Sequence, residues 1–170
     1  MTGERERQAV DRLKTSLLQA LEEFLDAHGI QCGRSTEPQA AREGQLATAA
    51  LLLQMTRAAD FRTSYQEGVA VRKALESVLA LSSEDAMLLV RLASQGDRLF
   101  TPLMELTSLL NAAYGPQEKA QLLERLWQVA FADAEVLAHE EYFIRKVAEL
   151  LRLSTADLIE AKVKAFESFR

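Results

Sequence analysis

The side chains best suited to chemistry in this sequence are four carboxylates that occur as two similar pairs. Glu67 lies seven positions after Asp60, and Glu140 lies seven positions after Asp133. Carboxylate oxygens are the ligands that hard divalent cations such as Ca²⁺ and Mg²⁺ prefer. Alternatively, each aspartate accepts backbone N–H bonds and fixes a tight corner between two helices. The residues alone leave both interpretations open.

The two pairs belong to an internal repeat. A segment of fifteen residues that begins at Ala59 aligns without a gap with a segment that begins at Ala132, so that each acid meets its counterpart. When one residue is removed further along, Ser82 also falls on Ser154. Self-similarity of this kind indicates a duplicated structural unit. Each unit reads as a helix, an acid, a short loop, a second acid, a second helix, a capping box and a third helix.

Helical periodicity predicts that all four acids point toward the interior, because each extends a line of residues at helical spacing. The lines are Ala49, Leu53 and Thr56 before Asp60; Leu122, Leu126 and Val129 before Asp133; Val71, Ala74 and Val78 after Glu67; and Ile144, Val147 and Leu151 after Glu140. An uncompensated buried charge costs several kcal/mol, a large part of a total stability of ~5–15 kcal/mol. Backbone amides or a cation must therefore compensate the acids.

The composition favours an all-α fold. The sequence has only 7 Gly and 3 Pro, is rich in residues that favour helices, and nowhere alternates with a period of two over a useful length. We expect a helical bundle of about seven to eight helices built from two pseudo-symmetric helix–loop–helix units. Besides a first helix in the N-terminal region, the expected helices lie near 45–60, 65–80, 83–95, 101–113, 117–133, 138–152 and 155–168.

Short motifs mark several of these boundaries. Ser82 with Asp85, and Ser154 with Asp157, have the spacing of capping boxes, in which side chains satisfy the free N–H groups of a helix start. Thr101-Pro102 places a capping residue before a proline at the first helical position. Tyr114-Gly115-Pro116 ends one helix and begins the next.

The N-terminal region reads as a separate element. Residues 1–28 form an amphipathic helix, residues 29–45 a linker rich in helix breakers, and residues 46–170 the main domain. The apolar stripe of the first helix contains Val10, Leu13, Leu17 and Phe24. This stripe either packs on the protein's own bundle or binds another protein or a second copy of the chain.

The charge and the cysteine content narrow the class of protein. A net charge of −5 and a pI near 5.2 argue against a nucleic-acid binder, which needs a basic face. The single Cys32 rules out an internal disulfide and fits a reducing compartment. The start of the chain lacks the apolar core of a signal peptide, and the apolar run 46–55 is too short to span a bilayer. We therefore expect a cytoplasmic protein.

The motifs of common enzymes are missing from the sequence. His139-Glu140 begins like the zinc-protease signature HExxH, but Phe143 stands where the second histidine must be. No set of nucleophile, base and orienting group is apparent, and no Gly-rich phosphate loop occurs. We expect no enzymatic activity.

The repeated pattern resembles the TerB-like family, which is linked to tellurite resistance. An Ala-Asp pair, a short loop, a glutamate and an apolar helix occur twice, and the resemblance covers about residues 46–168. It implies a helical bundle, cytoplasmic or membrane-facing, that serves as an adaptor in stress-response complexes. By position it assigns metal binding to Asp60, Glu67, Asp133 and Glu140, with Ca²⁺ or Mg²⁺ as the ion. The alternative is a helical scaffold or self-associating module whose acids only lock the helix corners.

Overall fold

The structure is a computed structural model that describes residues 16–27, 39–58, 65–95, 102–132 and 136–168. For residues 16–19, 39–42, 56–58, 65, 67 and 92–95 it describes the backbone alone. Over the described ranges the chain forms eight helices and no strand, which confirms the expected all-α bundle. The helices are α2 (Ser16–Ala27), α3 (Gln39–Ala58), α4 (Tyr65–Leu79), α5 (Ser83–Gln95), α6 (Leu103–Ala113), α7 (Pro116–Phe131), α8 (Ala138–Leu150) and α9 (Thr155–Glu167).

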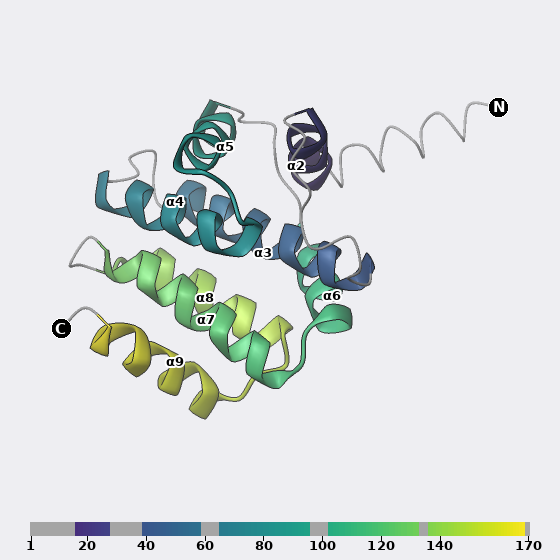
Figure 1. Cartoon of the computed structure of the whole chain (residues 1–170). Helices are drawn as coiled ribbons and strands as arrows, with labels where there is room; N and C mark the ends of the chain where they lie inside the picture. The colour runs from purple at the N-terminus through teal and green to yellow at the C-terminus, as the bar shows by residue number, and fades with distance from the viewer. Residues whose placement is uncertain (1–15, 28–38, 59–64, 96–101, 133–135, 169–170) are drawn as a thin grey trace, which may run out of the picture.

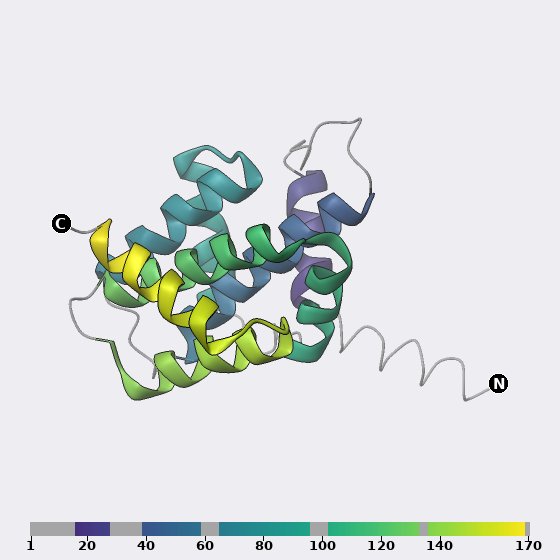
Figure 2. The same ribbon diagram turned by 90° about the horizontal axis from the view of Figure 1, so that it is seen from below.

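The helices are arranged in layers around α3. Figure 1 shows α2 and α5 on one side of α3 and α4, with α7 and α8 on the other side and α9 outermost. Helix α6 lies beside the first half of α3, and α9 packs on α7. In the view from below, α9 lies nearest the viewer and crosses in front of α7 (Figure 2). Among the described residues, no helix is both long and apolar enough to span a membrane.

Helix α3 is the centre of the core. Every side chain from Leu46 to Met55 is buried, including the polar Thr48 and Gln54. Helices α2, α4, α5, α6, α7 and α8 all contact α3. A helix that is apolar around its whole circumference belongs in the interior of a bundle. The apolar run 46–55 therefore fills the middle of the molecule.

The start of α3 corrects the predicted linker. The helix begins at Gln39, so residues 39–45 are helical and the helix start predicted near residue 45 is wrong. The linker predicted over residues 29–45 includes Gly44, but this residue lies inside α3, where the end of α6 packs against it. A Cβ atom on Gly44 would lie 2.9 Å from the Cβ of Ala113 and 2.9 Å from the Tyr114 ring. Glycine is needed at this position for close approach, not for a turn.

The end of α3 and the boundaries of α4 to α9 agree with the predicted ranges within two residues. The predicted start of the first helix lies outside the described residues. At Ser154 the predicted capping box is complete, because the Ser154 hydroxyl accepts from the Asp157 N–H and the Asp157 carboxylate accepts from the Ser154 N–H. The Ser154 N–H and the Ser154 hydroxyl both donate to the Asp157 carboxylate, and these two bonds lower the pKa of Asp157 below its usual value. Helix α7 starts with Gly115 as its N-cap and Pro116 at its first position, as predicted. Pro102, in contrast, is itself the N-cap of α6 and not its first helical residue.

The ends of α4 and α8 repeat the same backbone structure, which supports the duplicated unit. Ala80 follows directly after α4, and Arg152 follows Leu151, the C-cap of α8. Both residues are in the left-handed region, with φ values of 53° and 62°. The next residue donates its N–H five positions back in both cases, Leu81 to the Glu76 carbonyl and Leu153 to the Ala148 carbonyl. This bond is the mark of a Schellman C-cap. The two units differ in the third helix, since α5 packs on α4 whereas α9 packs on α7.

We predict opposite effects for alanine at two helical glycines. In Gly44→Ala the helix gains roughly 0.5–1 kcal/mol from the lower backbone entropy of the unfolded chain. The new methyl, however, meets Ala113 and the Tyr114 ring at 2.9 Å, and the Tyr114 hydroxyl lies 3.1 Å from the Thr48 hydroxyl. Overpacking of this kind costs roughly 1–3 kcal/mol, so we expect a net loss of about 1 kcal/mol in the free energy of unfolding.

Gly68→Ala in α4 is the matched control, because a Cβ there has no neighbour within 4 Å. It should raise the free energy of unfolding by roughly 0.5–1 kcal/mol. Urea denaturation of both variants and the parent measures the difference. If Gly44→Ala were as stable as Gly68→Ala, the close approach of α6 to α3 would be refuted.

Candidate functional site

The candidate site lies at the corner between α7 and α8. Helix α7 brings Leu122, Leu126 and Val129 into the core and ends at Phe131. Helix α8 begins at Ala138 and turns Ile144 and Val147 into the same core. The chain therefore reverses direction here with both helices anchored by apolar side chains.

Glu140 is the one predicted acid whose side chain the structure describes, and it is buried. Only 1% of its surface is exposed, and it lies on the face of α8 that carries Ile144, Val147 and Leu151. The prediction that Glu140 heads an inward-facing line is confirmed. Glu140 is in the first turn of α8, where the helix dipole favours a negative charge. The position thus offsets part of the cost of burying a carboxylate.

The neighbouring acid, Glu141, faces away from this buried position. Its carboxylate forms an ion pair with Arg145 on the next turn of α8, at 2.9 Å. His139 is half-buried, and its Nε2 atom is buried without a hydrogen-bond partner among the described residues. Phe143, which stands in place of the second histidine of a zinc-protease motif, packs in the core. Glu140 is therefore the only buried carboxylate among the residues that the structure describes.

The other predicted acids cannot be placed relative to Glu140. Asp60 and Asp133 lie outside the described residues, and for Glu67 the description is limited to the backbone of α4. In the described part of the chain no group of three or more His, Cys, Asp and Glu side chains is arranged to hold a metal ion. That part excludes both aspartates, so the four-carboxylate site stays a prediction.

The line of residues after Glu67 differs from the prediction. The buried line on α4 runs through Val71, Leu75 and Leu79, whereas Ala74 and Val78 are only partly buried. The cause is that Ala74 lines a groove between α4 and α7 and Val78 lines a second hollow beside α3 and α6. Helix α4 is thus rotated slightly from the orientation that we expected.

The first helix packs on its own bundle over the residues described. Leu21 and Leu25 belong to the core, and Phe24 is partly buried against it. Val10 and Leu13 lie outside the described residues, and for Leu17 only the backbone is described. The described part of the predicted partner-binding stripe is therefore used within the molecule.

Two surface features were not predicted from the sequence. The first is an exposed apolar line on α9 formed by Ala156, Ile159, Val163 and Phe166, whose 3-4-3 spacing is visible in the sequence. The second is the groove between α4 and α7, which depends on how the two helices meet and has no signal in either helix alone.

Comparison with known families agrees with these features. The chain has an all-helical fold with a duplicated helix–corner–helix unit and a buried acid at one corner. The family model described as "Tellurite resistance protein TerB" matches residues 45–163, well over half of the chain. The chain therefore belongs to the TerB family. No curated protein and no solved structure matched it.

Proposed function

We propose that this TerB-family chain is a non-enzymatic, cytoplasmic adaptor that binds a divalent cation at the α7–α8 corner and acts in a stress response such as tellurite resistance. The observation that supports the proposal is the burial of Glu140 in the first turn of α8. Asp133 comes directly after Ala132, the C-cap of α7. A cation held between these two carboxylates and backbone carbonyls would have the oxygen ligands that Ca²⁺ and Mg²⁺ prefer.

The energetics of Glu140 favour a specific compensating interaction. The dipole at a helix start contributes about 0.3–1 kcal/mol, and up to ~2 kcal/mol in partly buried sites. The effective penalty for removing one ion from water is several kcal/mol. The remainder must come from hydrogen bonds or from an ion close by. A divalent cation would compensate the charge of Glu140 and would also hold the ends of α7 and α8 together.

Calorimetric titration tests the cation. Protein freed of metal with a chelator and then titrated with Ca²⁺ or Mg²⁺ should release or absorb heat at one site. Glu140→Gln keeps the size of the side chain but loses the charge, and we expect it to weaken binding by at least about tenfold. Glu141→Gln is the matched control, because its carboxylate already pairs with Arg145, and its affinity should equal that of the parent.

Two results would contradict the proposal. If neither ion produced heat, or if Glu140→Gln and Glu141→Gln bound equally well, the corner would hold no cation. If Glu140→Gln then lowered only the melting temperature, backbone amides would be the partners of the acid.

Self-association through α9 is a second candidate function. Ile159, Val163 and Phe166 are each about half exposed, with 54%, 48% and 52% of their surfaces open to solvent. Phe166 also meets the Phe131 ring edge-on at 5.7 Å, which fixes it beside α7. A 3-4 spaced apolar line on an outer helix is the pattern of a helix–helix seam. The described part of the first helix is used within the molecule, so α9 is the better interface.

The charges beside this line suit a second copy of the chain. Lys162 lies on one edge, with its ammonium 4.9 Å from the centre of the Trp127 ring, and Glu167 lies on the other edge. The two residues are five positions apart. In a parallel pair of helices this spacing brings the lysine of one copy beside the glutamate of the other.

Sedimentation velocity tests this interface. The parent chain should form a dimer whose fraction rises with concentration, and Val163→Glu should remain a monomer because it places a charge in the seam. Met104→Glu makes the same kind of change at a highly exposed apolar residue on α6, and it should dimerise like the parent. A parent chain that stays monomeric over the whole accessible concentration range would refute the second function.

A further inference from the structure

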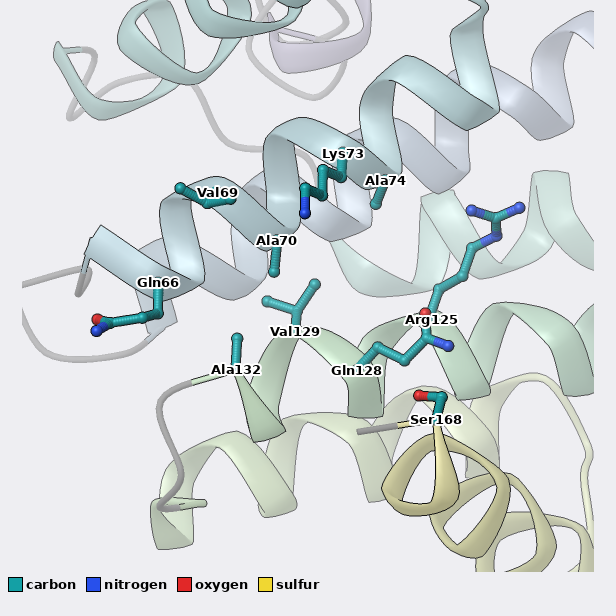
Figure 3. A pocket seen from close by; sticks show the side chains of 10 residues that line it. All are labelled: Gln66, Val69, Ala70, Lys73, Ala74, Arg125, Gln128, Val129, Ala132 and Ser168. Atoms are coloured by element: carbon teal, nitrogen blue, oxygen red, sulfur yellow. The ribbon is translucent and has the colours of Figure 1, made fainter. Parts of the chain in front are cut away.

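The groove between α4 and α7 has the size and lining of a small-ligand site. Its volume is about 460 Å³, and Ser168, just after α9, is one of its lining residues. This volume lies in the range of roughly 300–1,000 Å³ that is usual for small-molecule pockets. Figure 3 shows α4 and α7 facing each other across the space, with Ser168 beside Gln128.

The floor of the groove is apolar. It is formed by small and branched side chains from both helices, namely Val69, Ala70, Ala74, Val129 and Ala132. The alanines explain why the groove exists, because their short side chains leave the space between α4 and α7 unfilled. Such a floor suits a short hydrocarbon body.

The charges on the walls are positive. Lys73 from α4 and Arg125 from α7 line the groove, and no carboxylate lines it among the described residues. The Lys73 ammonium points into the space between the helices in Figure 3. The chain as a whole carries a net charge of −5, so a groove lined by two cations and, in the described part of the chain, by no carboxylate is a local exception. Such a pair favours a negatively charged group.

Arg125 is held in place at one end of the groove. Its Nη2 donates to the Ser77 hydroxyl of α4 at 3.3 Å, which ties the two helices together. Guanidinium has five N–H donors in a rigid fork, so most of them stay available for a carboxylate. The amide groups of Gln66 and Gln128 add neutral donors along the walls.

We propose that the groove between α4 and α7 binds a small amphipathic anion, a carboxylate on a short aliphatic chain. Lys73 binds the carboxylate, Arg125 at the end of the groove supplies a second positive charge, and the apolar floor takes the chain. An inorganic anion would leave the floor unused. A neutral ligand would gain nothing from the two cations. The groove reaches the α7–α8 corner at Ala132, but the binding of this anion needs no divalent cation.

NMR titration with sodium octanoate, in the presence of a metal chelator, tests this site. Amide signals of α4 and α7 along the groove should shift and saturate together. Lys73→Gln and Arg125→Gln should each raise the Kd by about tenfold, the value of one charge-assisted hydrogen bond. Lys146→Gln removes the same charge from α8, outside the groove, and should leave the Kd unchanged. Arg125→Gln also loses the hydrogen bond to Ser77 and could be destabilised by that loss. Lys73→Gln lacks this complication and tests the site by itself.

Two further ligands separate the contribution of the negative charge from that of the hydrocarbon chain. 1-Octanol has the same chain without the charge and should bind at least about tenfold more weakly. Inorganic phosphate has the charge without the chain and should cause no saturable shift in the groove. The proposal is overturned if octanoate does not bind there, if octanol binds as tightly, if phosphate saturates the same signals, or if Lys146→Gln weakens binding as much as Lys73→Gln.

Discussion

The burial of α3 on every side is the constraint on which the rest of the structure depends. All its side chains from Leu46 to Met55 are buried, and six other helices cover them. Each of them contributes an apolar face, and α6 comes close enough only because Gly44 has no side chain. Apolar burial is the dominant favourable term in folding, and here it is concentrated around one helix.

The buried acid at the α7–α8 corner is a consequence of this core. Helix α8 contacts α3, and its buried face carries Ile144, Val147 and Leu151. Glu140 lies on the same face one turn before Ile144, so the register that buries the apolar residues also buries the carboxylate. The burial of the apolar residues offsets the free-energy cost of burying the Glu140 carboxylate. The carboxylate is then placed to bind backbone amides at the corner or a cation.

The exposed line on α9 and the groove between α4 and α7 lie on helix faces that the core does not cover. Helix α9 covers α7 with Ala161 and Ala165, and its flank with Ile159 and Val163 remains exposed. The groove between α4 and α7 remains open because alanines meet there. Both features follow from helices that need only part of their surface for the bundle.

The sequence predicted those parts of the structure that local interactions determine. Ser154 with Asp157, and Gly115 with Pro116, fix helix boundaries through their own backbone hydrogen bonds or dihedral angles. Periodicity correctly placed Glu140 inside. The start of α3 was not predicted because glycine usually breaks a helix. Gly44 instead lies inside α3, where it allows α6 to approach closely. The rotation of α4 and the groove depend on distant helices, and no local pattern encodes them. The spacing of the line on α9 is visible in the sequence, but it does not show whether another helix covers that line.

Native-state amide hydrogen exchange is the most direct measurement of the central role of α3. Amides from Leu46 to Met55 should exchange only by global unfolding, with a free energy equal to that from denaturant melts and the same dependence on denaturant. Amides of the outer helices α5 and α9 should open at lower free energies. If the α3 amides exchanged through a local opening below the global value, while α5 or α9 stayed protected, α3 would not be the helix that organises this fold.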